Sequence, residues 1–285
     1  MTTVNEALQF GRALGLDPLD AQLLLLHALG KTPVERSWLL AHGDAALPQW
    51  VQAQWQAWAA RLAGGEPLAY LTGHKEFYGL PLAIDPRVLD PRADTETLVD
   101  WALELPVDGL QDDRPGTGTT PVRVMDLGTG SGAVALALKH QRPHWQVHAV
   151  DCSADALAVA RSNAQRLNLQ INFAHGNWLG SAEDRFHAIV SNPPYIAEGD
   201  PHLAALVHEP LGALASGADG LDAIRAIVTQ APARLLPQGW LLLEHGFNQA
   251  EPVCALLEAA GFSGVASRRD LAGIARCSGG RWAGA

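Results

Sequence analysis

The segment Asn192-Pro193-Pro194-Tyr195 contains residue types that can hold a planar NH2 group. Proline has no backbone N–H and a fixed φ, so the carbonyl groups of Asn192 and Pro193 are expected to point outward instead of into a sheet ladder. The Asn192 side chain adds an amide beside these carbonyls, and Tyr195 offers an aromatic face. Two adjacent acceptors match the two hydrogens of an amide or amino nitrogen. The alternative is an ordinary turn, because Asn-Pro and Pro-Pro are common in loops.

An apolar run at residues 186–190 comes directly before this segment and predicts a buried strand. The segment would then lie at the carboxyl end of that strand, where open α/β sheets bind their ligands. The sequence therefore predicts that residues 192–195 bind a substrate nitrogen, with Asn192, Pro193 and Tyr195 in direct contact with it.

A glycine-rich turn follows an earlier predicted strand at residues 122–126. The turn contains Gly128, Thr129, Gly130, Ser131 and Gly132 and leads into an alanine-rich helix. In this arrangement backbone N–H groups line a ligand at the helix N-terminus. With Ala133 in the last position the glycines also fit the dinucleotide-binding pattern, so a nicotinamide or flavin cofactor remains an alternative.

Acidic residues at strand ends favour a different cofactor. A carboxylate at Asp126 would repel a pyrophosphate but attract a sulfonium or ammonium group. Asp151 ends the next predicted strand, at the spacing at which an acidic side chain takes ribose hydroxyls. Asn177 and Trp178 follow a short strand at 171–174 and offer a polar edge and an aromatic plane for adenine. Sulfonium, ribose and adenine together describe S-adenosyl-L-methionine.

These motifs resemble those of class I methyltransferases that act on NH2 nitrogens. Further stretches resemble the PrmC/HemK family, the glutamine methyltransferases that modify the Gly-Gly-Gln motif of peptide chain release factors; they are residues 67–73, 76–80, 88–96 and 242–246. The resemblance covers essentially the whole chain, and the segment 67–96 carries most of its specificity. The chain departs from the family pattern at Asn177, where aspartate is usual, and at His208, where an aromatic residue is frequent.

The resemblance implies an α/β fold, a class I Rossmann-like S-adenosylmethionine-dependent methyltransferase sheet with a small N-terminal α-helical bundle. It also implies methyl transfer to the side-chain amide nitrogen of the Gly-Gly-Gln glutamine in class 1 release factors, without a metal. The expected catalytic residues are Asn192, Pro193 and Tyr195, and Pro194 joins them in binding the substrate. The expected cofactor-binding residues are Asp126, Gly128, Thr129, Gly130, Ser131, Gly132, Asp151, Asn177, Trp178 and Asn192.

Three parts of the chain are expected: a helical bundle at 1–66, a β-hairpin linker at 67–92 and the methyltransferase domain at 93–285. Asp17-Pro18 opens one helix of the bundle, and Val51, Trp55, Trp58 and Leu62 form one face of another. We expect core packing for that face, and the resemblance implies that the bundle helps to recognise the protein substrate. Residues 108–120 are predicted to form an exposed loop.

Strands and helices alternate after residue 122, which predicts a mostly parallel sheet with helices on both faces. Helices are expected at 154–167, 222–235 and 250–260, a buried strand at 240–244, and a closing hairpin in 262–282. His245 beside the end of the buried strand is expected to be structural, because transfer to an amide needs orientation more than proton removal.

Composition limits the function classes. The 285 residues are 48% hydrophobic with a formal charge of −10. This charge argues against a protein that binds a nucleic-acid backbone over a broad surface. The three cysteines lack metal spacing and fit a reducing cytoplasm, and no long apolar run signals a membrane. An adenine-specific DNA or RNA amino-methyltransferase, a nicotinamide oxidoreductase and a non-catalytic release-factor or ribosome adaptor remain the alternatives.

Overall fold

The computed structural model of the chain describes residues 2–107, 121–180, 182 and 184–284. It divides into two units, of which the first contains Met1–His74 with Ala205–His208 and the second contains Lys75–Ala204 with Glu209–Ala285. The predicted loop at 108–120 lies outside the described residues.

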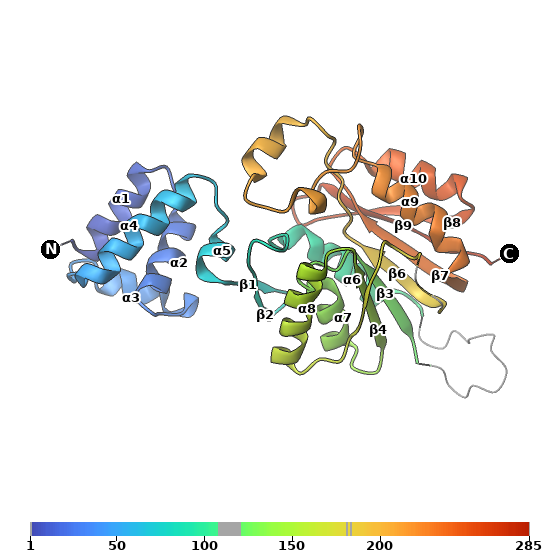
Figure 1. Cartoon of the computed structure of the whole chain (residues 1–285), viewed down its shortest axis with the longest axis horizontal. Helices are drawn as coiled ribbons and strands as arrows, with labels where there is room; N and C mark the ends of the chain where they lie inside the picture. Colours follow the sequence, from blue (N-terminus) through green and yellow to red (C-terminus); the bar gives the residue numbers. More distant parts are fainter. Residues whose placement is uncertain (1, 108–120, 181, 183, 285) are drawn as a thin grey trace. The chain divides into compact units, whose positions relative to one another are not determined.

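The first unit is a bundle of short helices (Figure 1). Its elements are α1 (Val4–Ala13), α2 (Pro18–Ala28), η1 (Pro33–Glu35), α3 (Arg36–Ala41), α4 (Gln49–Ala63) and α5 (Leu68–Thr72). The Asp17 carboxylate caps α2 by accepting the N–H of Leu19 at 2.8 Å, as the sequence predicts. On α4, Val51 and Trp55 are buried in the core of the bundle, and Trp58 and Leu62 pack against it. The expectation of a core face is therefore confirmed.

The hairpin prediction holds for only part of its range. Strands β1 (His74–Phe77) and β2 (Leu80–Ala83) pair as a hairpin, but the residues before them form α5. That helix ends at Gly73, whose φ of 75° is the left-handed conformation that glycine adopts without steric cost. Our expectation of a hairpin from residue 67 was therefore wrong, because a short helical turn precedes the first strand.

The second unit contains a seven-stranded sheet in the order β5-β4-β3-β6-β7-β9-β8. The strands are β3 (Arg123–Leu127), β4 (Gln146–Asp151), β5 (Asn172–His175), β6 (Phe186–Ser191), β7 (Leu235–Glu244), β8 (Phe262–Arg269) and β9 (Ala275–Trp282). Strands β5, β4, β3, β6 and β7 pair in parallel, and β9 and β8 add an antiparallel hairpin at one edge. The predicted strands and closing hairpin are confirmed.

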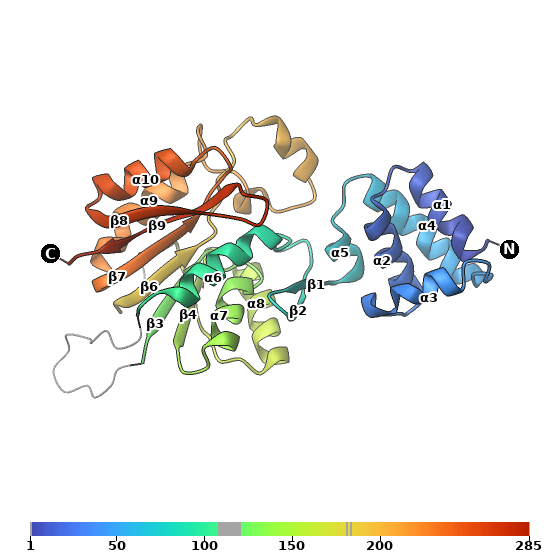
Figure 2. The same cartoon turned by 180° about the vertical axis from the view of Figure 1, so that it is seen from behind.

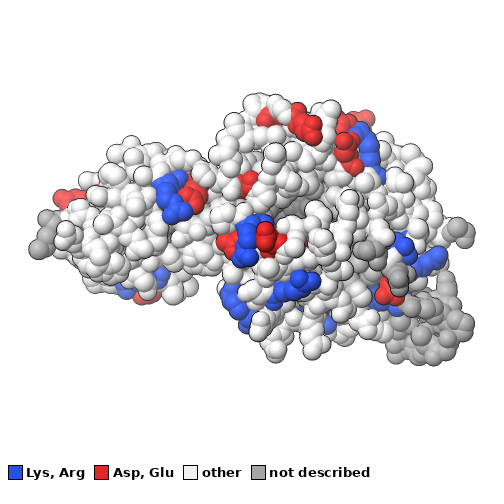
Figure 3. All heavy atoms as spheres, in the orientation of Figure 1, with Lys and Arg blue, Asp and Glu red and all other residues white. Residues whose placement is uncertain are grey.

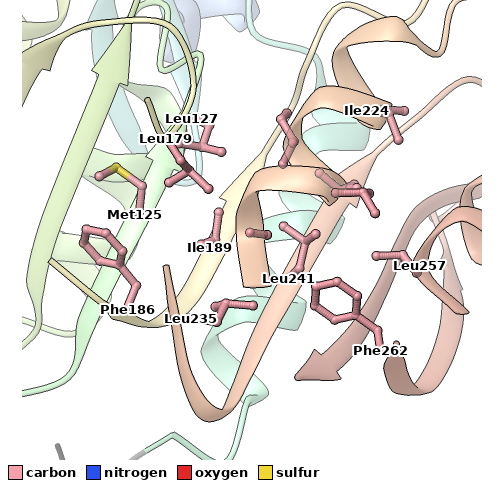
Figure 4. Close-up of a cluster of buried hydrophobic side chains, with 14 of the residues drawn as sticks. Met125, Leu127, Leu179, Phe186, Ile189, Ile224, Leu235, Leu241, Leu257 and Phe262 are labelled. Carbon is pink, nitrogen blue, oxygen red and sulfur yellow. The ribbon is translucent and has the colours of Figure 1, made fainter. Parts of the chain in front are cut away.

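Helices cover both faces of this sheet (Figures 1 and 2). They are α6 (Glu96–Glu104), α7 (Ala133–Gln141), α8 (Ala154–Leu167), α9 (Asp222–Gln230) and α10 (Ala250–Ala259). Figure 4 shows Ile224 of α9 and Leu257 of α10 in one buried cluster with Ile189 and Leu241 of the central strands. Trp101 of α6 packs on the other face, beside Gly279 of β9. The expected layered arrangement is confirmed.

One helix is shorter than predicted. Helix α9 stops at Gln230, and a 3-10 turn, η5 (Ala231–Ala233), leads into β7 at Leu235. Pro232 explains the early end, because its ring nitrogen has no N–H with which to continue the helical hydrogen bonds.

The parallel register brings several polar strand ends to one edge of the sheet. Leu127 of β3 pairs with Val150 of β4 and with Ser191 of β6, and Ser191 pairs with Leu243 of β7. The polar residues that end or follow these strands, Asp151, Asn192 and Glu244, therefore lie along the same carboxyl edge. This is the edge at which a parallel α/β sheet binds ligands.

Candidate active site

A cavity of about 210 Å³ lies at the carboxyl edge of the sheet, within the second unit. Its lining includes the sequence-predicted residues Gly128, Gly130, Asp151, Asn177, Trp178, Asn192 and Pro194. A smaller cavity of about 50 Å³ shares Gly128, Gly130 and Asn192 with it and is also lined by Asp126, Thr129 and Ser131. The fold thus brings the predicted cofactor residues and the predicted nitrogen holder to one place.

Asp151 is fixed at the rim of the turn by two backbone hydrogen bonds. Its Oδ2 accepts the N–H of Gly130 and its Oδ1 accepts the N–H of Ser153, each at 2.8 Å. A carboxylate oxygen has a second lone pair, so each oxygen can accept one more hydrogen bond. A rigid, nearly buried carboxylate at the cavity wall can therefore accept both hydroxyls of a vicinal diol.

Four of the five N–H groups in the glycine turn are used within the protein. Gly128 and Thr129 both donate their N–H to the Val150 carbonyl, at 2.9 and 3.0 Å, and Gly132 donates to the Thr129 carbonyl at 2.8 Å. Gly130 donates to the carboxylate at the end of β4. The expectation that N–H groups of this turn line a ligand therefore does not hold for Gly128, Thr129, Gly130 and Gly132. A pyrophosphate needs free donors here, so the arrangement disfavours a dinucleotide.

The Asp126 carboxylate is bonded to the turn and to the start of α7. It is buried, and its Oδ2 accepts the hydroxyl of Thr129 at 2.6 Å and the N–H of Ala135 at 3.2 Å. Burial raises the pKa of Asp126 to about 7, although the hydrogen bonds from Thr129 and Ala135 oppose the shift. Asp126 thus ties the turn to the start of α7 and carries only part of a negative charge near neutral pH.

Asn177 and Trp178 also line the larger cavity. Trp178 has a φ of 51°, and its ring packs on Gly128, where Cζ3 lies 3.4 Å from the position that a Cβ would take. A side chain at Gly128 would also be strained, because its φ is 68°. The glycine therefore lets the indole lie across the turn and present an aromatic surface at the cavity.

Asn192 is held by a residue that we did not assign from the sequence. Its Nδ2 donates to the hydroxyl oxygen of the buried Thr95 at 3.1 Å. Because the amide nitrogen is engaged there, the Asn192 Oδ1 is left as an acceptor. Ser191, directly before it, donates its hydroxyl to the Leu127 carbonyl at 2.7 Å and so ties the ends of β6 and β3 together.

The rest of the proline motif differs in role from residue to residue. Pro194 lines the cavity, and Pro193 is buried. The Tyr195 hydroxyl donates to Oε1 of Glu244 at 3.3 Å, and its carbonyl accepts the Gln249 amide at 3.0 Å. Burial, followed by the negative charge of Glu244, raises the pKa of Tyr195, so this hydroxyl stays protonated.

The two residues missed by sequence reasoning, Thr95 and Glu244, both lie in stretches that carried the family resemblance. In the sequence, each is only a polar residue at a predicted strand end or helix start. Without the fold, such a residue cannot be distinguished from an ordinary helix cap or strand end. His245 is structural, as expected, because it is buried and its ring nitrogens pair with the Gly246 carbonyl at 2.9 Å and the Ser278 hydroxyl at 2.8 Å. The departure at His208 lies in the first unit, where its ring contacts the Gly64 carbonyl at 3.3 Å.

Comparison with known proteins identifies the family. The PrmC N-terminal domain model matches residues 5–73, and the methyltransferase small domain model matches residues 97–219. Release factor glutamine methyltransferase of Bordetella pertussis is 49% identical over 270 residues, which are 93% of this chain and 95% of that protein. The enzyme of the same name from Coxiella burnetii is 46% identical, over 90% of this chain and 89% of that protein. This chain belongs to the release factor glutamine methyltransferase family.

Solved structures support the class I methyltransferase fold of this family member. A methyltransferase from Pyrococcus furiosus is 19% identical with a TM-score of 0.52, and covers 81% of this chain and 100% of that one. The 16S rRNA N2 G1207 methyltransferase RsmC of Thermus thermophilus, solved with AdoMet and guanosine, is 21% identical with a TM-score of 0.51. That match covers 73% of this chain and 49% of RsmC. Within the described residues, no helix has the length and apolarity to span a membrane.

The buried carboxyl of Asp126 should make stability depend on pH. Its folded-state pKa is raised, so its contribution is full below the ordinary aspartate pKa and is lost as pH rises through about 7. Asp126→Asn should therefore cost more stability at pH 5.5 than at pH 8.5. Thermal unfolding of both proteins at the two pH values checks this, and a melting-temperature difference that does not change with pH would contradict it.

Proposed function

We propose that this protein transfers a methyl group from S-adenosyl-L-methionine to the side-chain amide nitrogen of the glutamine in the Gly-Gly-Gln motif of class 1 release factors. The observation that carries the proposal is the fixed amide of Asn192, which borders the same cavity as the carboxylate of Asp151. Relatives named for this activity match more than nine-tenths of the chain, and the family model of the N-terminal domain matches its bundle.

The residues of the cavity fit S-adenosyl-L-methionine. Asp151 would accept the ribose hydroxyls, and Asn177 and Trp178 would hold the adenine by its edge and face. Because most N–H groups of the glycine turn are bonded within the protein, the turn suits a cofactor that has no phosphate. When bound, the cofactor supplies an electrophilic methyl group on a sulfonium. Asp126 behind the turn would favour that positive charge, though less than a fully ionised carboxylate would.

Asn192 and Pro193 would orient the acceptor amide. An amide nitrogen is a poor nucleophile because its lone pair is delocalised, so catalysis must come mainly from alignment. The Asn192 Oδ1 and the carbonyl of Pro193 would accept the two hydrogens of the glutamine NH2 and fix its direction of approach. Holding two reactants in line contributes roughly 7–11 kcal/mol to lowering a barrier. This makes positioning the leading effect.

Tyr195 would shape the acceptor side and would not remove the proton. Its hydroxyl is bonded to Glu244 and its raised pKa keeps it neutral at physiological pH. The proton that the amide loses on methylation would pass to solvent. No metal is needed for this chemistry, and among the described residues no group of histidine, cysteine and acidic side chains is arranged to hold one.

An adenine-specific DNA or RNA amino-methyltransferase is the alternative that shares the proline motif. On the face shown in Figure 3, Lys and Arg lie among Asp and Glu and do not gather into a broad basic surface. The formal charge of −10 adds to this argument, because phosphate binding depends on cationic side chains. We therefore propose a protein substrate in the cytoplasm, with no direct contact to nucleic acid or membrane.

A label-transfer assay tests the function directly. The protein is incubated with methyl-labelled S-adenosyl-L-methionine and, separately, with a class 1 release factor, plasmid DNA and RNA. We expect label only in the release factor, and only in its Gly-Gly-Gln glutamine. A release factor with that glutamine replaced by alanine is the matched control substrate. Label in DNA or RNA instead would select the alternative.

Asn192→Ala should abolish most methyl transfer while cofactor binding stays near normal. The variant removes the Oδ1 acceptor and the bond to Thr95, so the amide loses its alignment. Misplacement of a reacting group costs on the order of 100-fold in rate. Turnover of release factor beside calorimetric titration of the cofactor checks this, and a normal methylation rate would eliminate the assigned role.

Asp151→Ala should weaken cofactor binding through the ribose. Loss of a charge-assisted contact is expected to raise the Kd by roughly tenfold or more. Asp155→Ala is the matched control, because Asp155 is an exposed carboxylate in the first turn of the following helix. Titration calorimetry compares the variants. Equal affinity for the cofactor in the Asp151 variant and in the wild type would refute this placement of the ribose.

A further inference from the structure

Two stretches far apart in the sequence line the larger cavity beside the predicted cofactor residues. One consists of residues 87–89, and the other contributes Pro210, Gly212 and Ala213. We call residues 210–213 the wall segment. Neither stretch supplies a group to the proposed methyl transfer, so their place at the cavity needs a separate explanation.

The wall segment consists of uncharged residues and is tied down at its ends. Within it, Ala213 donates its N–H to the Pro210 carbonyl at 2.9 Å. Directly after it, the Leu214 carbonyl accepts the N–H of Ile196 at 2.9 Å, which fixes that end beside the proline motif. The other end follows Glu209, so its position depends on what that residue binds.

Glu209 is a buried carboxylate that joins the two lining stretches. Its side chain is 3% exposed. Its Oε1 accepts a hydrogen bond from the Arg92 guanidinium, and its Oε2 accepts the N–H of Asp90 at 3.2 Å. Asp90 directly follows residues 87–89, and Glu209 directly precedes the wall segment. One side chain therefore connects two parts of the cavity lining whose anchors lie 119 residues apart in sequence.

Two cations balance the two carboxylates at this junction. Arg92 Nη1 lies 3.5 Å from Asp90 Oδ2, and Lys75 Nζ lies 3.4 Å from the same oxygen. Arg92 thus contacts both carboxylates with the two arms of its planar group, which a single ammonium group cannot do. Because desolvation offsets much of the attraction between buried charges, such a pair adds little net stability. Its contacts nevertheless fix where the two stretches lie relative to each other.

We propose that Glu209 is a positioning residue for cofactor binding, which holds the wall segment at the cavity through its bonds to Arg92 and Asp90. The inference rests on the proposed function, because it takes this cavity to be the S-adenosyl-L-methionine site. Glu209 is not among the residues that line the cavity, so its effect passes through the wall segment. In this position Pro210 and Ala213 present apolar surface to the cavity.

The size of the effect follows from the fraction of molecules whose wall segment is in place. The apparent Kd scales inversely with that fraction, so a wall segment in place in about one molecule in ten raises the Kd about tenfold. Bound cofactor selects the molecules in which the segment is in place, so kcat at saturating cofactor changes little. A positioning role therefore separates the two quantities, because it raises the Kd for the cofactor and leaves kcat close to its wild-type value.

Glu209→Gln removes the ion pair with little change in shape. The glutamine oxygen can still accept the Asp90 N–H, but the negative charge that holds Arg92 is lost. We expect calorimetry to give a Kd for S-adenosyl-L-methionine about tenfold higher than that of the wild type, with kcat nearly unchanged. Glu104→Gln is the matched control, because it removes the same charge from an exposed carboxylate that pairs with Arg268 at 2.6 Å. A Glu209 variant with the affinity of this control and of the wild type would overturn the proposal.

S-adenosyl-L-homocysteine distinguishes an effect of the wall segment from a direct effect of charge. This product of methyl transfer keeps the adenosine and amino-acid groups but has no positive charge on its sulfur. If Glu209 acts through the wall segment, Glu209→Gln weakens the binding of both compounds by the same factor. If the variant weakens only S-adenosyl-L-methionine, the carboxylate acts on the sulfonium by Coulomb attraction, and the proposal is overturned.

A double-mutant cycle with Arg92→Met tests whether the two side chains act as one unit. Each single variant leaves one charge without its partner, whereas the double variant removes both members of the pair. We expect the cofactor Kd of the double variant to be about tenfold above the wild-type value, no higher than for either single variant, and not about a hundredfold as independent effects would give. A hundredfold increase would overturn the proposal. If a single variant does not fold, a double variant with the wild-type Kd would do so.

Cofactor affinity, stability and label transfer are measured separately. A lower melting temperature with an unchanged cofactor Kd would assign the ion pair to stability alone and refute the positioning role, while a wild type that labels release factor would still support the proposed function. A wild type that binds the cofactor but labels no release factor would refute the proposed function. The cofactor affinities of the variants then still decide the role of Glu209.

Discussion

The site depends on carboxylates that saturate backbone donors at the ends of parallel strands. Asp151 holds the Gly130 N–H, and Asp126 holds the start of α7 from below. Because four of the turn's N–H groups are used inside the protein, they fix its shape and are not available to a phosphate. A cavity built in this way can accept a cofactor that carries a positive charge and hydroxyl groups. The same turn with free donors would suit a dinucleotide.

A second set of hydrogen bonds fixes the residues of the acceptor side. Thr95 directly precedes α6, and its hydroxyl accepts a hydrogen bond from Asn192, which is 97 residues away in sequence. In the proline motif itself, the Tyr195 hydroxyl donates to Glu244 at the end of β7.

Much of the fold was open to prediction because strong local signals agreed with the tertiary structure. The apolar runs at β3, β4 and β6 and the helix at 154–167 follow directly from hydrophobic periodicity and capping. The misses have local causes as well. Pro232 ends α9 early. The residues before β1 form a short helix, whereas their aromatic and glycine residues had predicted part of a hairpin.

The sequence by itself determined the chemical types at the site, because Asn192, Asp151 and the glycine turn are contiguous motifs that follow recognisable strands. It could not determine which partners their hydrogen-bonding groups have in the folded protein. The inward use of the turn's N–H groups, the raised pKa of Asp126 and the approach of Thr95 to Asn192 arise only when distant segments pack together. Desolvation and hydrogen-bond direction are properties of that packing, and the order of residues along the chain does not specify them.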